Sequence, residues 1–216
     1  MKRRLLAHWL GLFAIGSLVA LPATAADEAP NALIDRLTKE ALSTLATDKG
    51  VQAGDVGRII ALMDDKVMPY LNFQRMTASA VGPAWRQATP EQRTRLQAEF
   101  KTLLVRTYAG AMSQAKNLSF EVKPLRASPD DKEVVVRTVI LGRGDPVQLD
   151  YRLEKTPGEG AGWKIYNLNV LGVWLVDTYR SQFAQEINAK GIDGLISTLT
   201  ERNKANGTGP AKPAKG

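Results

Sequence analysis

The chain has 216 residues, of which 29 are lysine or arginine, 22 are aspartate or glutamate, one is histidine and none is cysteine. That length suits one domain with a sizeable hydrophobic core. The single histidine is His8, close to the N-terminus. The rest of the chain therefore lacks the side chains that build a Ser-His-Asp triad, a cysteine nucleophile or the usual zinc site. Without cysteine no disulfide can form, so packing alone must hold the fold.

The N-terminus has the pattern of a secretory signal peptide. A positively charged start (Lys2-Arg3-Arg4) precedes an almost wholly apolar stretch over residues 5–21, and Ala23-Thr24-Ala25 supplies the small residues that signal peptidase reads. Cleavage is predicted after Ala25. The alternative is an uncleaved membrane anchor, which is disfavoured because the apolar stretch is short and stops beside a cleavage site.

The formal net charge of +7 lies almost entirely at the two ends of the chain. The predicted signal peptide carries part of it, and Lys204, Lys212 and Lys215 carry another part without any acid nearby. The charge between the ends is close to balanced, so it gives no case for binding nucleic acid. We expect a cleaved signal peptide over residues 1–25, a single domain over 26–203 and a disordered basic tail over 204–216.

Helical patterns come first along the chain. Apolar residues at helical spacing predict helices over residues 31–47, 55–67 and 90–114. A short helix is expected between the last two, with Asn72 or Thr77 as its N-cap. The clearest helix start is Thr89-Pro90-Glu91-Gln92, because threonine at the N-cap, proline at the first position and glutamine at N3 all agree.

The spacing of apolar residues then changes from the helical period to alternation. Four strands are predicted, over residues 118–122, 134–141, 147–154 and 163–170. Helical spacing returns over residues 174–189, and a last helix ending near residue 202 follows an interruption at Gly191. Helices, four strands in meander order and helices again indicate an α+β domain. We expect an antiparallel sheet whose apolar face is covered by the N-terminal and C-terminal helices.

No set of side chains in the sequence is convincing as a catalytic centre. The adjacent acids Asp64-Asp65 and Asp130-Asp131 fit a solvated helix face and a turn, because neighbours in sequence point in different directions. Gly142-Arg143-Gly144 precedes a strand and not a helix, so it is not a phosphate-binding loop. We therefore expect a binding protein with no metal and no cofactor.

Five segments of the sequence resemble one known family. They are VMPYLNF (67–73), WRQATPEQR (85–93), WKIYN (163–167), YRSQF (179–183) and GIDGL (191–195). In this order, and across roughly residues 30–200, they resemble the MlaC family of periplasmic phospholipid-binding components of the Mla lipid transport system. The same family is called the toluene-tolerance or ABC-transporter auxiliary family.

The resemblance implies a soluble shuttle in the periplasm of a Gram-negative bacterium. It would carry a diacyl glycerophospholipid between an outer-membrane lipoprotein–porin complex and an inner-membrane ABC transporter with a substrate-binding hexamer. The acyl chains would lie in a cavity between the sheet and the helices, and the chain would not be an enzyme. The sequence departs from the family at Asn167, Leu171 and Trp174, where two acids and a serine are typical. The departures bear on the pocket mouth, cargo range or partner contact, and Trp174 is a candidate to narrow or cover the entrance.

The predicted apolar faces give candidate lining residues for such a cavity, with an ordinary packed core as the alternative for about half of them. The candidates are Val67, Leu71, Phe73, Met76, Phe100, Leu103, Leu104, Tyr108, Met112, Val139, Leu149, Tyr151, Ile165, Leu168, Val170 and Val173.

Two further hypotheses remain beside the lipid carrier. One is a periplasmic adaptor or chaperone that binds protein and has a filled core. The other is a carboxylate-dependent enzyme, which needs two converging acids in a polar pocket. Basic residues near the long helix are candidate docking or lipid-surface contacts, and a solvated helix face is the alternative for them: Arg86, Arg93, Arg95 and Lys101.

Overall fold

The computed structural model describes residues 28–114, 117–128, 130–142 and 144–205. The predicted signal peptide lies outside the described residues, as does the tail from residue 206 onward. No helix in the described part of the chain is long and apolar enough to cross a membrane.

Five helical segments form the N-terminal part of the described chain. They are α1 (Pro30–Thr47), α2 (Lys49–Gln52), α3 (Val56–Leu62), the π-helical turn η1 (Met63–Val67) and the 3₁₀ turn η2 (Met68–Tyr70). The helix predicted over residues 55–67 is present as α3 and η1, with a change of hydrogen bonding at Met63. The sequence did not predict α2. It forms because the side chain of Asp48, where α1 ends, accepts a hydrogen bond from the Val51 amide.

Two helices with a short turn between them come next, and both helices begin where the sequence predicts. They are α4 (Phe73–Val81), the 3₁₀ turn η3 (Gly82–Arg86) and α5 (Pro90–Ser113). The side chain of Asn72 accepts a hydrogen bond from the Arg75 amide and caps α4. The capping box of α5 is complete, because Thr89 and Gln92 each accept a hydrogen bond from the other's backbone amide.

The sheet has antiparallel strands in meander order, as predicted, with one short strand added. The strands are β1 (Ser119–Val122), β2 (Glu133–Leu141), β3 (Val147–Lys155), β4 (Trp163–Val170) and β5 (Val173–Trp174). The extra strand β5 pairs with the end of β4. It forms because Leu171 and Gly172 both have a positive φ and turn the chain back on itself.

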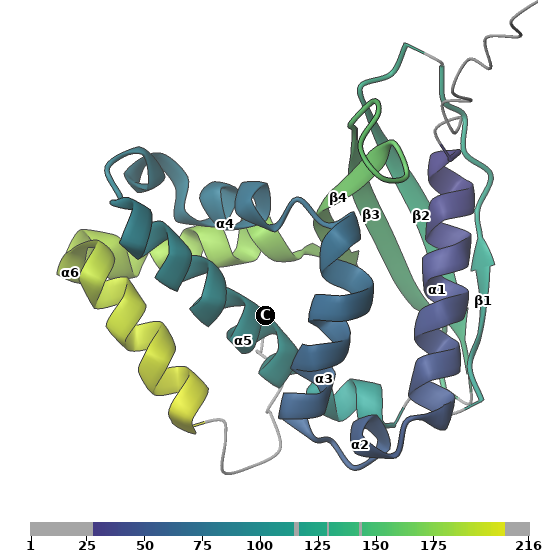
Figure 1. Ribbon diagram of the computed structural model, residues 1–216, viewed down its shortest axis with the longest axis horizontal. Helices are drawn as coiled ribbons and strands as arrows, with labels where there is room; N and C mark the ends of the chain where they lie inside the picture. Colours follow the sequence, from purple (N-terminus) through teal and green to yellow (C-terminus); the bar gives the residue numbers. More distant parts are fainter. Residues whose placement is uncertain (1–27, 115–116, 129, 143, 206–216) are drawn as a thin grey trace, which may run out of the picture.

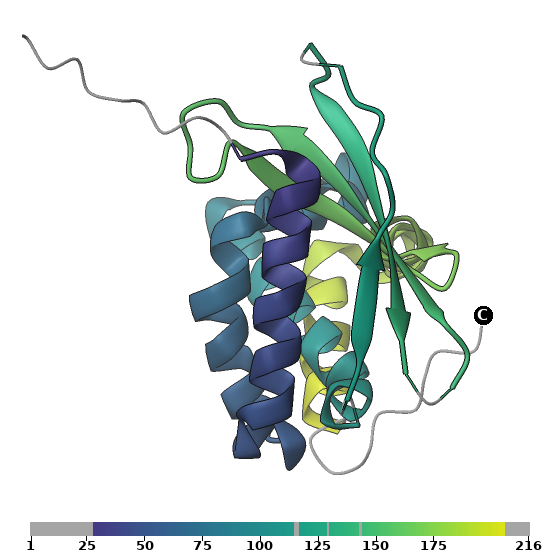
Figure 2. The ribbon, with the colours of Figure 1, turned by 90° about the vertical axis from the view of Figure 1, so that its right-hand side faces the viewer.

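Strand register divides the side chains of the sheet between two faces. Val136 lies opposite Tyr151, which lies opposite Leu168, so these three share one face. We call it the inner face, because α1 packs on it and lies alongside the strands (Figures 1 and 2). Val139 lies opposite Gln148 and belongs to the other face, the outer face.

The C-terminal helix α6 (Leu175–Ala205) has two arms. Gly191 divides them, because its backbone angles (φ 70°, ψ −174°) are not helical. The predicted interruption at this glycine is confirmed. The second arm lies along α5 (Figure 1), where the side chains of Thr200 and Asn203 both donate hydrogen bonds to Glu99. Lys204, which the sequence analysis placed in the tail, still belongs to the helix.

A polar cluster centred on Arg75 attaches the helices to the sheet. The Arg75 guanidinium pairs with Glu133 at 2.6 Å and with Glu154, and it lies 3.6 Å from the centroid of the Tyr166 ring. The Asn72 amide donates a hydrogen bond to Glu154 at 2.6 Å. These contacts join α4 to β2, β3 and β4 at once, and we call this set the Arg75 cluster.

Replacing Arg75 with glutamine is expected to lower the free energy of unfolding by about 1–3 kcal/mol, because charge-assisted hydrogen bonds and the contact with Tyr166 are lost. Urea denaturation followed by circular dichroism measures the change. The control is Arg95→Gln on the exposed side of α5, which is expected to change stability by less than about 0.5 kcal/mol. Equal stability of the two variants would contradict the linking role of Arg75.

Lowering the pH is expected to remove part of the stability that Arg75 contributes. The hydrogen bond from Arg75, assisted by the Tyr166 hydroxyl, holds the pKa of Glu133 below its usual value. A carboxylate with a lowered folded-state pKa contributes stability above its unfolded pKa of about 4.3, and this is lost as pH falls through the lower folded value. The stability difference between wild type and Arg75→Gln should therefore shrink below about pH 4. A difference that stays constant from neutral to acidic pH would argue against this linkage.

Candidate functional site

The buried apolar side chains among the described residues form three separate clusters. The helical cluster joins α4, α5 and α6 around Phe100 and Phe183, whose ring centroids are 5.3 Å apart. The sheet cluster joins Leu33 and Ile34 of α1 to the inner face of the sheet. The α3 cluster joins α2, α3 and α5 around Ile59. A domain usually has one contiguous core, so the region between these clusters is the candidate site.

The long helix α5 borders this region with a stripe of half-buried side chains. Leu103 belongs to the helical cluster and Ala109 to the α3 cluster, so two different sides of α5 are packed. At about 100° per residue, Leu104, Tyr108 and Met112 form a stripe between those two sides. All three keep accessible surface. Leu104 contacts the helical cluster, Met112 contacts the α3 cluster and Tyr108 belongs to neither.

The inner face of the sheet changes from buried to half-buried along its strands. Val136 and Leu153 are fully buried in the sheet cluster. On the same face, Leu149, Leu168 and Val170 are half-buried and belong to none of the three clusters. The sheet therefore presents a second apolar surface that is not packed against a cluster.

Two tyrosines show that these surfaces are enclosed as well as accessible. Burial raises the pKa of the Tyr108 and Tyr151 hydroxyls, although both side chains are only half-buried. The hydroxyls of Thr138 and Thr38 partly oppose the rise at Tyr151. Tyr108 on α5 and Tyr151 on β3 therefore combine accessible surface with surroundings that disfavour the charged phenolate.

Most of the predicted lining residues keep part of their surface accessible. These are Val67, Leu71, Leu104, Tyr108, Met112, Leu149, Tyr151, Leu168 and Val170. Others are fully packed, in the helical cluster or the sheet cluster: Phe73, Met76, Phe100, Leu103 and Ile165.

Of the two remaining predicted lining residues, one lies on the outer face and the other is exposed. Val139 is on the outer face, because its register partner is Gln148 and not Leu149. The run of β-branched residues in β2 has no clear alternation, so the sequence could not separate its two faces. Val173 lies opposite Val170 in the register and so shares the inner face, but it is 48% exposed in the short strand β5.

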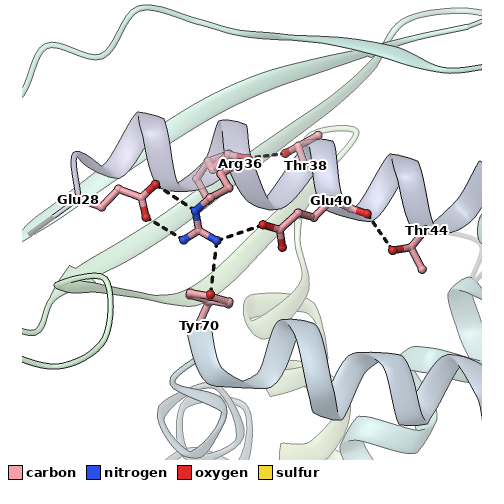
Figure 3. Close-up of polar contacts among 7 residues, drawn as sticks. Glu28, Arg36, Thr38, Glu40, Thr44 and Tyr70 are labelled. Carbon is pink, nitrogen blue, oxygen red and sulfur yellow. Dashed lines mark hydrogen bonds and ion pairs between the residues drawn. The ribbon is translucent and has the colours of Figure 1, made fainter.

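The start of α1 is fixed by a polar cluster that the sequence did not reveal (Figure 3). Arg36 donates hydrogen bonds to Glu28 at 2.8 Å and to the Tyr70 hydroxyl at 3.4 Å, and these bonds raise the pKa of Arg36. Tyr70 lies in η2, next to Leu71, which contacts both the helical cluster and the sheet cluster. Arg36 thus ties α1 to the proline-containing segment between α3 and α4.

The departure at Asn167 has a structural role at the start of α6. The Asn167 side-chain oxygen accepts hydrogen bonds from the amides of Leu168 at 2.9 Å and Val176 at 3.2 Å. The amides in the first turn of a helix need such acceptors. Asn167 supplies one of these acceptors, for the Val176 amide.

Trp174 itself lies away from the inner face. It pairs with Asn169, which lies opposite Asp150 in the register of the outer face. Its ring lies 4.0 Å from the Arg152 guanidinium, which also belongs to the outer face. The register therefore places Trp174 on the outer face, and the expectation that it narrows or covers the entrance of a cavity stays a prediction. Leu171, in the turn before β5, is 63% exposed.

The acid pairs take part in local structure. Asp64 pairs with Lys101 at 2.7 Å, and Asp131 accepts a hydrogen bond from the Ser128 amide at 2.8 Å. In the part of the chain that the structure describes, no group of three or more histidine, cysteine, aspartate or glutamate side chains could hold a metal ion.

The four basic docking candidates differ in their surroundings. Lys101 is occupied by its ion pair with Asp64, and Arg93 donates hydrogen bonds to the backbone oxygens of Trp85 and Arg86. The side chains of Arg86 and Arg95 are exposed and make no polar contact with the described residues.

Comparison with known proteins relates the chain to one family. The profile of the family described as MlaC protein matches residues 35–201. The chain is 27% identical to the toluene tolerance protein ttg2D of Pseudomonas putida over 211 residues, which cover 93% of this chain and 97% of that protein. It is 19% identical to the intermembrane phospholipid transport system binding protein MlaC of Haemophilus influenzae, over 88% of this chain and 89% of that protein.

A solved structure shares the fold. The phospholipid-binding protein of Ralstonia solanacearum, determined in complex with a phospholipid, is 41% identical to this chain and has a TM-score of 0.78. The match covers 82% of this chain and 98% of that one.

Proposed function

The chain belongs to the MlaC protein family, and from this premise we propose that it is a periplasmic phospholipid carrier. Residues 1–25 are then the signal peptide that directs export, and residues 26–203 form the lipid-binding domain. The chain itself carries out no catalysis. The phospholipid bound by the Ralstonia solanacearum relative supports this assignment of the cargo.

The observation that carries the proposal is the division of the apolar core. Half-buried apolar side chains line the region between the three clusters, on α5 and on the inner face of the sheet. A protein-binding adaptor with a filled core has no need of such surfaces. We assign the acyl chains to this region, with a lining formed by Val67, Leu71, Leu104, Tyr108, Met112, Leu149, Tyr151, Leu168 and Val170.

The energetics of the cargo fit an enclosed apolar site. Exposing an acyl chain to water costs about 0.8 kcal/mol for each CH₂ group, or on the order of 20 kcal/mol for a whole diacyl lipid. Both tails must therefore be enclosed during transfer, while the charged headgroup stays at the mouth in water. The lining must also release the lipid. The unbranched side chain of Met112 and the π-helical turn η1, which ends at Val67, suit an adaptable wall.

The partners proposed for the carrier are two membrane complexes. One is an outer-membrane lipoprotein–porin complex, and the other is an inner-membrane ABC transporter with a substrate-binding hexamer. The description of the Haemophilus influenzae relative as part of an intermembrane phospholipid transport system supports such a route. ATP would be hydrolysed by the transporter.

Native mass spectrometry of the mature protein, purified from periplasm without detergent, tests the cargo. We expect phospholipid in near-stoichiometric amount, confirmed by lipid extraction of the same sample. The mass of the mature chain also tests cleavage after Ala25. A protein that is free of lipid, and stays so after incubation with phospholipid vesicles, would favour the adaptor hypothesis.

A matched pair of variants tests where the acyl chains lie. Leu149→Trp adds a large side chain to the half-buried part of the inner face and is expected to reduce lipid loading several-fold. Val139→Trp adds the same side chain on the neighbouring strand but on the outer face, and is expected to load normally. Thermal unfolding checks that both variants are folded, because overpacking costs about 1–3 kcal/mol. Normal loading of a folded Leu149→Trp variant would place the cavity elsewhere.

A further inference from the structure

A hollow lies on the side of α4 that faces away from the helical cluster. It has a volume of about 370 Å³ and lies between α4, η3 and the first arm of α6, which run side by side in Figure 1. Its wall is formed by Arg75, Ala78, Ser79, Gly82, Pro83, Trp85, Arg86 and Arg180. On α4, Phe73 and Met76 face the helical cluster and are buried, so the hollow opens on the outer side of that helix. We call it the arginine pocket.

The arginine pocket has an excess of positive charge. Three of its wall residues are arginines and none is an acid. Arg75 is already neutralised by Glu133 and Glu154. Arg86 and Arg180 are exposed, and their guanidinium groups make no hydrogen bond or ion pair with the described residues. Two unpaired cations on one concave wall attract an anion more strongly than scattered surface charges do.

The backbone of the pocket is shaped and held in place. Gly82 has φ +71°, a conformation that residues with a side chain rarely adopt, and it turns the chain from α4 into η3. The Arg180 Nε lies 3.7 Å from the position that a Cβ atom on Gly82 would take, so Arg180 lies close over this turn. Arg93 of α5 holds η3 by donating hydrogen bonds to the backbone oxygens of Trp85 and Arg86.

We propose that the arginine pocket binds an acidic segment of a protein partner, with a carboxylate at Arg86 and Arg180 and an adjoining apolar side chain against Trp85. Guanidinium groups bind carboxylates through paired, charge-assisted hydrogen bonds. Arginine and tryptophan are also the residues that most often dominate protein interfaces. Ala78, Pro83 and Trp85 give the pocket an apolar wall that a carboxylate alone would leave unfilled.

The volume also favours a peptide over a small anion. The hollow, of about 370 Å³, is open to solvent, so it would hold a bound segment along one side without enclosing a whole molecule. A single phosphate or lipid headgroup would contact the arginines and leave the tryptophan side empty. The inference does not depend on lipid binding, because no residue of the arginine pocket belongs to the proposed lipid-site lining.

The test is a selection of random peptides displayed on phage, carried out on the mature protein. Wild type is compared with Arg86→Gln/Arg180→Gln, in which both unpaired cations are removed from exposed positions. The control is Arg95→Gln/Arg137→Gln, which removes two exposed arginines outside the pocket. We expect peptides selected on wild type to carry aspartate or glutamate beside an apolar residue. A synthetic peptide of the most enriched sequence should bind the pocket variant about tenfold more weakly or worse, the control variant within about twofold, and less tightly as salt is added.

Three outcomes would overturn the proposal. They are no enrichment on wild type, enrichment without acidic residues, and equal binding to the wild type and the pocket variant. Inorganic phosphate is tested alone by titration, and phosphate binding without selection of acidic peptides would mean an anion site and no docking site. Lipid content is measured in every variant. A wild-type protein without lipid would count against the carrier function and leave the peptide result unaffected.

Discussion

The guanidinium group of Arg75 links the helices to the sheet in a molecule whose buried apolar side chains form separate clusters. It reaches from α4 to acids on two neighbouring strands and lies on the face of Tyr166 from a third. An ordinary α+β domain joins its helices to its sheet through buried apolar side chains. Here Leu71 contacts both the helical cluster and the sheet cluster, and the Arg75 cluster adds a polar link, in which Asn72 makes a direct hydrogen bond from the start of α4 to the sheet.

A polar link of this kind does not require apolar side chains to fill the region between the clusters. Filling the region between the three clusters would stabilise the fold by about 25 cal/mol for each Å² of apolar surface buried, so a carrier forgoes this stabilisation wherever it keeps room for cargo. Contacts at the edges can replace part of it without occupying the interior. Arg36 does this at the start of α1, where it bonds to Glu28 and Tyr70. The helical cluster, with Phe100 in contact with Tyr179 and Phe183, remains densely packed and supplies a rigid wall.

Sequence reasoning worked where the signal is local. The capping box at Thr89, the cap at Asn72 and the interruption at Gly191 depend on residues a few positions apart, and all three are present. It failed where the answer depends on distant partners. Nothing near Arg75 in the sequence indicates two acids on different strands. The face of Val139 is set by strand register, which an unbroken run of β-branched residues does not specify. The spacing of apolar residues also does not distinguish a fully buried side chain from a half-buried one, because both lie on the same apolar face of a helix or strand.

The two proposed binding regions use different sides of the same helices. Among the helices, α4 buries one side in the helical cluster and contributes its other side to the arginine pocket, to which α6 adds Arg180, while α5 borders the proposed lipid region with Leu104, Tyr108 and Met112. Arg93, near the start of α5, fixes η3 at the pocket. A partner bound at the arginine pocket would therefore contact the helices and would not itself lie on the inner face of the sheet. Such an arrangement separates recognition from cargo exchange, because a carrier that must load at one membrane and unload at another needs an anchor that does not obstruct the path of the lipid.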